Sequence, residues 1–255
     1  MTTSFSPPSL GSAFDIDDAL QKNGYAVLTA PLVAEAAGCD LPALCAFNPL
    51  WNDLPPDGYL KDGGRYRRRR HSCFVVDAST VAQVPHRAHW QPVEYNALHG
   101  GMQRWFEPMD AALLVHPVWR KLLVWLAAVS NRHWPTVPPS AQPWYVEAHQ
   151  FRIDTTDGIG RPTPEGAHRD GVDLVAVFMV DRVGVKGGET RVFDANGPAG
   201  QRFTLTESWS LLLLDDARVI HESTPIQPLA EGGYRDTLVV TLRSGGFQGA
   251  GQVAV

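Results

Sequence analysis

The stretch Pro162-Thr-Pro-Glu-Gly-Ala-His-Arg-Asp-Gly-Val-Asp173 places a histidine and a carboxylate two residues apart, at His168 and Asp170. Because residues i and i+2 of a strand point to the same face, these two side chains are predicted to hold one metal ion. A second histidine, His221, lies much later in the sequence and must reach the ion from another strand folded over the first. Two histidines and one carboxylate form the facial triad of non-haem Fe(II) sites, which leaves positions open for a chelating cosubstrate and dioxygen.

A histidine two residues before an aspartate is common by chance, and a surface strand or a capped turn would explain it without a metal. The surrounding composition favours a metal site, because the nearby segments have the apolar runs of buried strands, separated by turn residues. His221 ends a short strand and is predicted to face the mouth of a barrel. The predicted strands cover Val172–Val180, Glu189–Phe193, Trp209–Leu214 and Ala217–His221.

Arg235 follows His221 in a segment, Tyr234–Arg243, whose apolar and polar residues alternate. Arg235 and Thr237 therefore share one face of a predicted strand that adjoins the metal site. An arginine and a threonine two apart can hold a carboxylate through a charge-assisted fork and a hydroxyl. A surface ion pair is the alternative role for the arginine, and its position relative to His221 favours the carboxylate site.

The order His-x-Asp, a long gap, His and then Arg resembles the 2-oxoglutarate- and Fe(II)-dependent dioxygenases. Within that superfamily the sequence looks like the bacterial subfamily that contains the L-isoleucine 4-hydroxylases. The resemblance extends from about Leu54 to Arg243. The stretches that carry the narrower similarity are Pro162–Asp173, Gly187-Gly-Glu-Thr190 and Asp62-Gly-Gly-Arg-Tyr-Arg67.

This resemblance implies an enzyme that uses Fe(II), 2-oxoglutarate and dioxygen, with ascorbate as a helpful reductant in vitro. His168, Asp170 and His221 would hold the iron. Arg235, helped by Thr237, would bind the distal carboxylate of 2-oxoglutarate and fix its orientation. The reaction would release succinate and carbon dioxide. The subfamily resemblance implies a free L-amino acid as the substrate, hydroxylated on a carbon of its side chain.

A zwitterionic amino acid needs an acidic group for its ammonium and a basic group for its carboxylate. The acidic candidates are Glu147, Glu165 and Asp173, and the basic candidates are Arg67, Arg152 and Arg169. Gln150 is a further candidate for contact with 2-oxoglutarate. It shares with Glu147 and Arg152 a predicted strand, Tyr145–Ile153, that would cross the barrel floor, and either face of this strand could turn inward.

Other functions fit the same residues. The chemistry could act on a side chain of a protein or peptide, or on a different small molecule. A cupin-type metal enzyme could use the triad without 2-oxoglutarate, but Arg235 would then need another role. A binding barrel without catalysis would bind iron equally well after Asp170 is replaced.

The bulk properties fit one enzyme domain. A length of 255 residues with a net charge of −5 gives no general reason to expect nucleic acid or an anionic membrane as a partner. No apolar run has the length of a transmembrane helix, and the first residues lack the pattern of a signal peptide. Cys39, Cys45 and Cys73 show no metal-site spacing, so we expect reduced thiols in a cytoplasmic protein. The small-molecule substrate is implied by the resemblance alone.

Helical patterns precede strand patterns along the sequence, which predicts a mainly β (α+β) fold. Its core would be a double-stranded β-helix, of the jelly-roll or cupin-like kind, with N-terminal helices packed outside. Within a single domain spanning 1–255, we expect disorder over 1–12, a support region over 13–140 and the metal-binding core over 141–245. Helices are predicted at Asp15–Gln21, over Met102–Leu113 and from Pro117 to Val129, with a strand at Tyr25–Thr29.

Five arginines lie between Arg65 and Arg70, just before an apolar strand-like run. With a period of two, Arg65, Arg67 and Arg69 face one way and would line the pocket mouth, while a solvated strand is an equal alternative. A nucleic-acid site is disfavoured, because the sequence lacks a wider basic footprint.

Glu147-Ala-His149 resembles a second carboxylate and histidine pair, and it could form a rival metal site with His168. We disfavour this site, because the downstream arginine and threonine would then have no role. The other histidines lack ligand spacing and are assigned to structure. They are His71, His86, His89, His99, His116 and His133.

Overall fold

A seven-stranded antiparallel sheet forms the main layer of the structure, a computed structural model that describes residues 11–12, 15–77, 79–135 and 143–249. The strands lie in the order β1-β9-β5-β12-β4-β2-β3. β12 pairs with β4 on one side and with β5 on the other, at the centre of the sheet. The strands are β1 (Tyr25–Leu28), β2 (Arg67–Asp77), β3 (Thr80–Gln83), β4 (Trp144–Asp154), β5 (Leu174–Val183), β9 (Ser210–Asp215) and β12 (Tyr234–Arg243).

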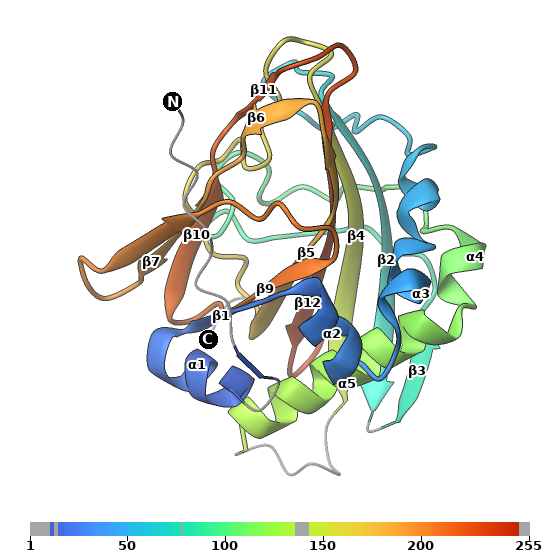
Figure 1. Ribbon diagram of the computed structural model, residues 1–255, viewed down its shortest axis with the longest axis vertical. Helices are drawn as coiled ribbons and strands as arrows, with labels where there is room; N and C mark the ends of the chain where they lie inside the picture. Colours follow the sequence, from blue (N-terminus) through green and yellow to red (C-terminus); the bar gives the residue numbers. More distant parts are fainter. Residues whose placement is uncertain (1–10, 13–14, 78, 136–142, 250–255) are drawn as a thin grey trace.

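Two smaller sheets lie across from the main sheet, so that the strands enclose an interior (Figure 1). One has the order β10-β7-β8, and the other pairs β11 with β6. This arrangement confirms the predicted fold class, a mainly β structure with a double-stranded β-helix. The strands are β6 (Val185–Gly187), β7 (Thr190–Asp194), β8 (Gly200–Phe203), β10 (Val219–Ser223) and β11 (Ile226–Pro228).

The helices lie outside the strands, along the lower and right-hand edges of the view in Figure 1. The longest described helix, α5, has proline in its first turn, where the missing N–H costs no hydrogen bond, and it contacts β2, β3 and α1. The helices therefore support the outer face of the main sheet, as predicted. They are α1 (Ile16–Asn23), α2 (Ala30–Ala36), α3 (Leu41–Cys45), the 3-10 turn η2 (Asn48–Trp51), α4 (Ala111–Leu114) and α5 (Pro117–His133).

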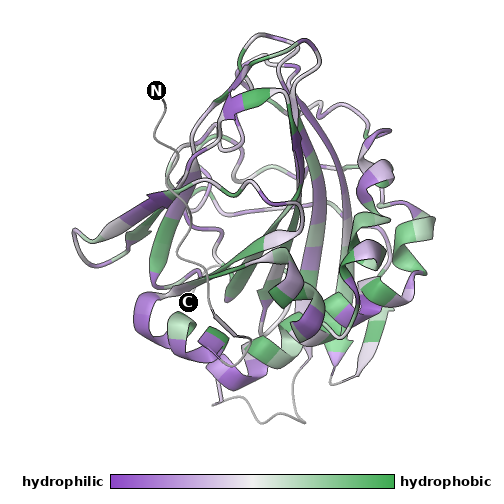
Figure 2. Cartoon of the chain, viewed as in Figure 1, coloured by the Kyte–Doolittle hydropathy of each residue, from purple (hydrophilic) through white to green (hydrophobic). Residues whose placement is uncertain are grey.

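The large hydrophobic core lies between these helices and the main sheet. Along β12, Leu238, Val240 and Leu242 are buried in this core, while the residues between them face the interior of the barrel. The predicted alternation of this strand is therefore confirmed. Figure 2 shows apolar and polar residues alternating along the long strands of the main sheet.

The helix predicted over Met102–Leu113 is wrong, because in this region only Ala111–Leu114 is helical. Arg104 exchanges two backbone hydrogen bonds with His89, at 2.9 and 3.0 Å, and these hold the segment in a β-bridge. Phe106 and Met109 are buried nevertheless, whereas Trp105 is 52% exposed. The apolar spacing therefore reflects partial burial of an irregular segment and not a helical face.

The main sheet contains strands from both the predicted support region, 13–140, and the predicted metal-binding core, 141–245. β1 pairs with β9, and β2 pairs with β4, so early and late segments share one sheet. Residues 1–10, where disorder was expected, lie outside the described residues. The remaining predicted helices and strands are confirmed within a few residues of their expected ends.

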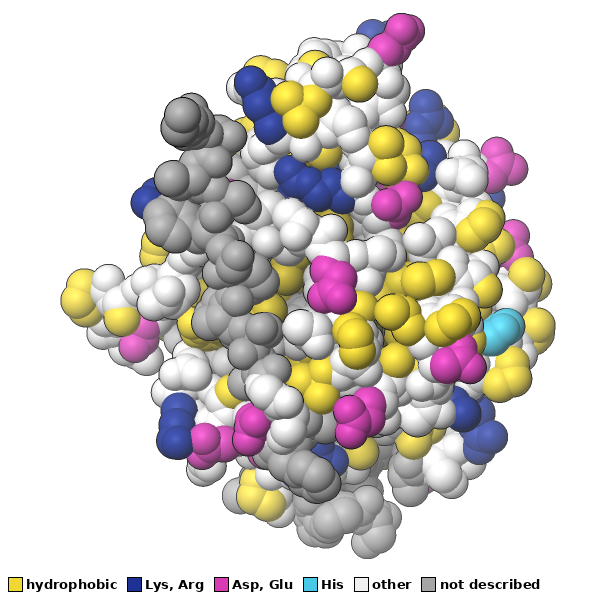
Figure 3. Space-filling model, in the orientation of Figure 1, with side chains coloured by type: hydrophobic (Ala, Val, Ile, Leu, Met, Phe, Trp, Pro, Cys, Tyr) yellow, Lys and Arg dark blue, Asp and Glu magenta, His cyan; other side chains and the backbone are white. Residues whose placement is uncertain are grey.

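Basic and acidic side chains are interspersed on the face shown in Figure 3, without a large area of one sign there. Among the described residues, no single helix has the length and apolar character needed to cross a membrane. α2 and the segment Leu41–Trp51 meet that standard only as a pair, with a bend of 103° between them. The three cysteines are free, and Cys73 is buried.

Gly171 follows Asp170 and has a φ of +75°, in the left-handed region that favours glycine. A Cβ at this position would lie 2.5 Å from the Tyr95 ring and 2.8 Å from Nε2 of Gln248. We expect Gly171→Ala to lower the free energy of unfolding by about 2–5 kcal/mol, because backbone strain and overpacking add.

Gly158→Ala is the matched control, because Gly158 has a φ of +83° and a Cβ there would meet nothing within 4 Å. The free energy of unfolding of this variant should fall only by the cost of backbone strain, about 1–2 kcal/mol. Unfolding in urea, followed by circular dichroism, measures this free energy for both variants. Equal losses in the two variants would contradict the close packing around Gly171.

Candidate active site

A single backbone bridge brings the predicted metal ligands together. His168 and His221 exchange two N–H to carbonyl hydrogen bonds, each 3.0 Å long. Nε2 of His168 lies 3.8 Å from one carboxylate oxygen of Asp170, and Nε2 of His221 lies 3.8 Å from the other. The three side chains therefore face one point, and their ligand atoms lie within 4.8 Å of one another.

The His-x-Asp pair does not lie within a strand, contrary to the prediction, because β5 begins only at Leu174. Instead, Asp216 holds the turn. Its carboxylate accepts hydrogen bonds from the three consecutive backbone N–H groups of residues 170–172, at 2.9, 2.7 and 3.2 Å. These bonds satisfy amides that a turn leaves unpaired, and they fix the direction of the Asp170 side chain.

Other hydrogen bonds orient the ligand atoms of the triad. Nδ1 of His168 donates to the carbonyl of Gly166 at 2.9 Å, which leaves the lone pair of Nε2 free on the Asp170 side. Nε2 of Gln91 donates to Oδ1 of Asp170 at 3.0 Å. Partners of this kind fix the tautomer and the direction of metal-binding residues.

The charges around the triad suit a divalent cation. Burial raises the pKa of Asp170, and His168 partly opposes that shift. The pKa of Asp216 is raised to about 7 by burial and by the charge of Asp170. Burial and the neighbouring His168 lower the pKa of His221, so its imidazole is neutral at pH 7. A divalent cation would offset the crowded carboxylates and requires neutral imidazoles as ligands.

The distances in the triad also fit one ion. Two atoms that each lie about 2.1 Å from a metal can be no more than about 4.2 Å apart. The two separations of 3.8 Å satisfy that limit. Two imidazoles and one carboxylate are the donor set of an Fe(II) facial triad, so His168, Asp170 and His221 fit this metal.

Arg235 and Thr237 face the interior from β12, as their alternation predicted. The Arg235 side chain is buried, and its Nε has no hydrogen-bond partner among the described residues. Burial and the nearby Arg182 lower the pKa of Arg235 to about 10, so the guanidinium is still charged at neutral pH. A buried cation without an anion is costly, so this site fits a carboxylate of a small molecule.

The triad and Arg235 open into one cavity of about 140 Å³ inside the barrel. Charged residues of both signs line the rest of this cavity, and several of their polar atoms are buried without a partner among the described residues. The arrangement therefore offers separate sites for cationic and anionic groups of a ligand. These residues are Arg67, Arg69, Arg104, Arg243, Glu147 and Glu165.

The period of two correctly places Arg67 and Arg69, which face the cavity. The prediction is wrong for Arg65, which lies before β2, is exposed and pairs with Asp157 at 2.9 Å. Behind the cavity wall, the buried Asp57 lies 2.7 Å from Nε of Arg67 and 3.7 Å from Nη1 of Arg69. Burial alone would raise the pKa of Asp57, but the two guanidinium groups outweigh it and lower the pKa. Asp57 is therefore ionised at neutral pH and fixes both arginines.

The two faces of β4 decide which of its predicted residues reach the cavity. Glu147 faces inward, so Gln150 and Arg152 point to the opposite side of the sheet. Gln150 donates to the carbonyl of Leu50, and Arg152 donates to Asp236 at 2.8 and 2.7 Å. These positions contradict the predicted roles of Gln150 in 2-oxoglutarate binding and of Arg152 in substrate binding.

Two more predicted substrate residues lie outside the cavity. Asp173 accepts hydrogen bonds from the backbone N–H and the hydroxyl of Ser244, at 2.6 and 2.9 Å. Arg169 extends toward Tyr95 and donates to the carbonyl of Ala217 at 3.4 Å. Both residues hold loops in place, so their predicted contact with substrate is wrong.

The sequence interpretation missed a cluster of histidines around Glu147. His71 and His149 occupy inward positions of β2 and β4, and the period of two could have placed them there. His89 lies in an irregular segment, where no periodic signal exists. The rival metal site predicted for Glu147 and His149 with His168 is not formed, because Glu147 contacts His71 and His89 instead.

The comparisons with known proteins agree with this geometry. The family model described as 2OG-Fe dioxygenase matches residues 48–241. The protein belongs to this family. A solved bsmA homolog from Methylobium petroleophilum PM1 is 51% identical in sequence, with a TM-score of 0.89, over 96% of this protein and 97% of that one.

More distant members of the fold are also similar in structure. IDO from Bacillus thuringiensis is 16% identical, with a TM-score of 0.73, over 95% of this protein and 100% of that one. The Fe(II)/α-ketoglutarate-dependent dioxygenase TqaL is 21% identical, with a TM-score of 0.67, over 90% of this protein and 86% of that one. No curated protein matches the sequence.

Family membership confirms the chemistry that the motifs predicted. The protein is a 2-oxoglutarate-dependent non-haem iron oxygenase, and its cofactors are Fe(II), 2-oxoglutarate and dioxygen. The triad is the group of residues that fits the iron, and Arg235 with Thr237 fits the distal carboxylate of 2-oxoglutarate.

We expect Asp170→Ala to weaken metal binding by more than about 100-fold, because loss of an orienting partner alone costs 10–100-fold. Titration of the metal-free protein with Mn(II) in a calorimeter measures this affinity. Asp157→Ala, in the Arg65 ion pair on the surface, is the control and should bind like the wild type. Unchanged binding in Asp170→Ala would exclude the triad as the metal site.

We expect Arg235→Gln to weaken 2-oxoglutarate binding about 10- to 150-fold, since the lost hydrogen bonds to a charged group contribute 1.5–3 kcal/mol. The Mn(II)-loaded protein can be titrated with 2-oxoglutarate to measure the change. Arg191→Gln is the matched control, because Arg191 pairs with Glu189 and Glu222 on the surface. Equal affinities in Arg235→Gln and the wild type would remove Arg235 from the site.

Proposed function

We propose that this enzyme hydroxylates an aliphatic carbon in the side chain of a free L-amino acid, coupled to conversion of 2-oxoglutarate into succinate and carbon dioxide. The observation that carries the proposal is the shared cavity. The triad, the Arg235–Thr237 pair and a further set of charged residues all line it. The further set contains both signs of charge, as a zwitterion requires.

Three arginines in this set have unused donors. Nη2 of Arg67, Nε of Arg69 and Nε of Arg104 are buried without a hydrogen-bond partner among the described residues. Arg104 also donates to Gln91 at 2.9 Å, and burial lowers its pKa to about 10, so it is charged at neutral pH. Such donors fit the carboxylate of an amino acid.

Charged groups of both signs lie around the substrate region. Arg67, Arg69, Arg104 and Arg243 line the cavity with guanidinium groups, and Glu147 and Glu165 line it with carboxylates. A free amino acid supplies one group of each sign, so each of its charged groups would meet a group of opposite charge in this cavity.

The size of the cavity favours a small substrate. A volume of about 140 Å³ within the barrel suits a small molecule, whereas a protein substrate needs an open groove. The motifs that resemble the L-isoleucine 4-hydroxylases support the same substrate class. The arginine and glutamate residues would then fix one carbon of the substrate beside the metal.

Each part of the site has a distinct role in this proposal. Iron bound at the triad supplies the oxidation of the C–H bond when 2-oxoglutarate and dioxygen are present. Arg235 and Thr237 hold 2-oxoglutarate in one orientation. Aliphatic and aromatic side chains form part of the cavity wall; Val177, Phe151 and Val239 belong to them.

The test is succinate formation with Fe(II), ascorbate and 2-oxoglutarate in the presence of each free L-amino acid, with Asp170→Ala as the blank. We expect one or a few amino acids to increase succinate formation. Each of these should give a product about 16 mass units heavier than the amino acid, as for one added oxygen atom, in about the same molar amount as succinate. Succinate that forms without dependence on any amino acid would overturn the substrate class and favour another small molecule or a protein.

A further inference from the structure

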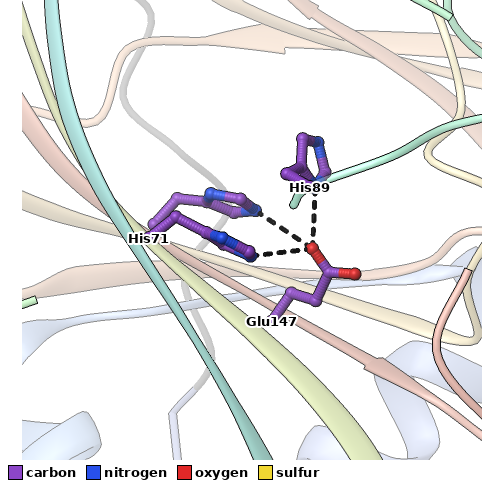
Figure 4. Close-up of side chains that lie close together, drawn as sticks. His71, His89 and Glu147 are labelled. Atoms are coloured by element: carbon purple, nitrogen blue, oxygen red, sulfur yellow. Dashed lines mark hydrogen bonds and ion pairs between the residues drawn. The ribbon is translucent and has the colours of Figure 1, made fainter. Parts of the chain in front are cut away.

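Glu147 forms a buried cluster with His71, His89 and His149, which we call the Glu147 cluster. Nε2 of His71 lies 2.9 Å from Oε2 of Glu147, and Nδ1 of His89 lies 2.7 Å from the same oxygen. Figure 4 shows the two rings approaching this oxygen from different directions. The cluster lies outside the triad, but its members His89, Glu147 and His149 line the same cavity.

Hydrogen bonds hold the Glu147 cluster together without a metal ion. Its contacts of 2.7 and 2.9 Å match charge-assisted hydrogen bonds. The triad differs, because its imidazole nitrogens lie 3.8 Å from the carboxylate oxygens of Asp170, too far for hydrogen bonds.

The hydrogen bonds determine the charge of the cluster. A carboxylate only accepts, so both rings donate N–H groups to Glu147. Burial lowers the pKa of His71, of His149 and of His89, the last to about 3, so the rings are neutral at pH 7. Burial would raise the pKa of Glu147, but its contacts with His89 and His71 outweigh it and lower the pKa. The cluster therefore carries one negative charge.

One oxygen of Glu147 is left for a ligand. Both imidazole bonds end on Oε2, and Figure 4 shows the other oxygen turned away from His71 and His89. That oxygen, Oε1, accepts no hydrogen bond from the described residues, and the Glu147 side chain is 10% exposed at the cavity. An ionised carboxylate with a free oxygen inside a cavity is a site for a cation.

Both Nη atoms of Arg69, which faces the same cavity, have other partners. Nη2 bonds Nδ1 of His149 at 2.8 Å, and Nη1 lies 3.7 Å from Asp57, while Nε has no partner among the described residues. Its guanidinium also stacks over the Phe106 ring at 3.8 Å. Arg69 therefore belongs to the wall and leaves Oε1 of Glu147 accessible.

We propose that Oε1 of Glu147 binds the α-ammonium group of the substrate, with His71 and His89 as positioning residues that hold the carboxylate in place. This inference rests on the proposed function. The other acidic residue of the cavity, Glu165, also has an oxygen without a partner among the described residues, Oε2. Its Oε1, however, lies 3.6 Å from Nε2 of His168, the atom that faces the iron, and the ion would repel an ammonium group there.

The test compares amino acids with their 2-hydroxy acids, which replace the ammonium by a hydroxyl. The Mn(II)- and 2-oxoglutarate-loaded enzyme, which does not turn over, is titrated in a calorimeter with the twenty common L-amino acids. The best binder is then compared with the 2-hydroxy acid of the same side chain and configuration. We expect the wild type to bind the amino acid at least about 30-fold more tightly, as for a buried charge pair.

Glu147→Gln keeps the size of the residue and should reduce this preference to within about threefold. His89→Gln should lower the preference partly, because the carboxylate loses one of its two donors, and should leave 2-oxoglutarate affinity unchanged. Glu94→Gln, on the exposed segment near this region, is the matched control and should retain the full preference.

A preference that persists in Glu147→Gln or His89→Gln would overturn this inference and leave the proposed function intact. Equal affinity of the wild type for the amino acid and the hydroxy acid would also overturn this inference and leave the proposed function intact. If the wild type bound two metal ions per protein and Glu147→Gln bound one, the Glu147 cluster would be a metal site, and this result would also overturn the inference. Binding of 2-oxoglutarate but of no amino acid would overturn the inference together with the proposed substrate class.

Discussion

Two backbone hydrogen bonds between His168 and His221 are the constraint on which the active site depends. They join a turn to β10, and without them the ligands of the triad would belong to separate segments of the protein. Asp216 completes the arrangement by capping the three amides at residues 170–172. The metal site is therefore placed by backbone pairing and one buried carboxylate, while the strands on either side supply the rigidity.

The long central strands face the hydrophobic core on one side and the cavity on the other. Along β12, alternate residues enter the hydrophobic core or face the cavity, so Leu238 packs under the helices while Arg235 and Thr237 meet the cosubstrate region. The same rule places Glu147 inward on β4. Charged groups can be buried here because they are compensated: Asp57 holds two arginines, and two imidazoles hold Glu147. These contacts orient the lining side chains before any ligand enters, which lowers the cost of binding.

Much of the fold and the core of the site could be predicted from sequence, because period-two alternation and the His-x-Asp spacing are local signals. The fold class, the long strands and the inward positions of Arg67 and Arg235 followed from them. The errors arose where local signals are ambiguous. Gln150 and Arg152 were misplaced because alternation shows that a strand has two faces but does not say which one is inside. His89 was missed because its position depends on a β-bridge between irregular segments, which leaves no pattern in the sequence.

Different segments supply the metal ligands and the residues that face the substrate region, and this separation affects how the enzyme can change over evolution. The triad comes from the turn before β5 and from β10, whereas the residues that face the substrate region come mainly from β2 and β4, on the other side of β12. Substitutions on β2 and β4 can therefore alter which molecule is admitted without touching the residues that fit the iron. A scaffold of this kind separates selectivity from reactivity, so a lineage can acquire new substrates while its oxidation chemistry stays the same.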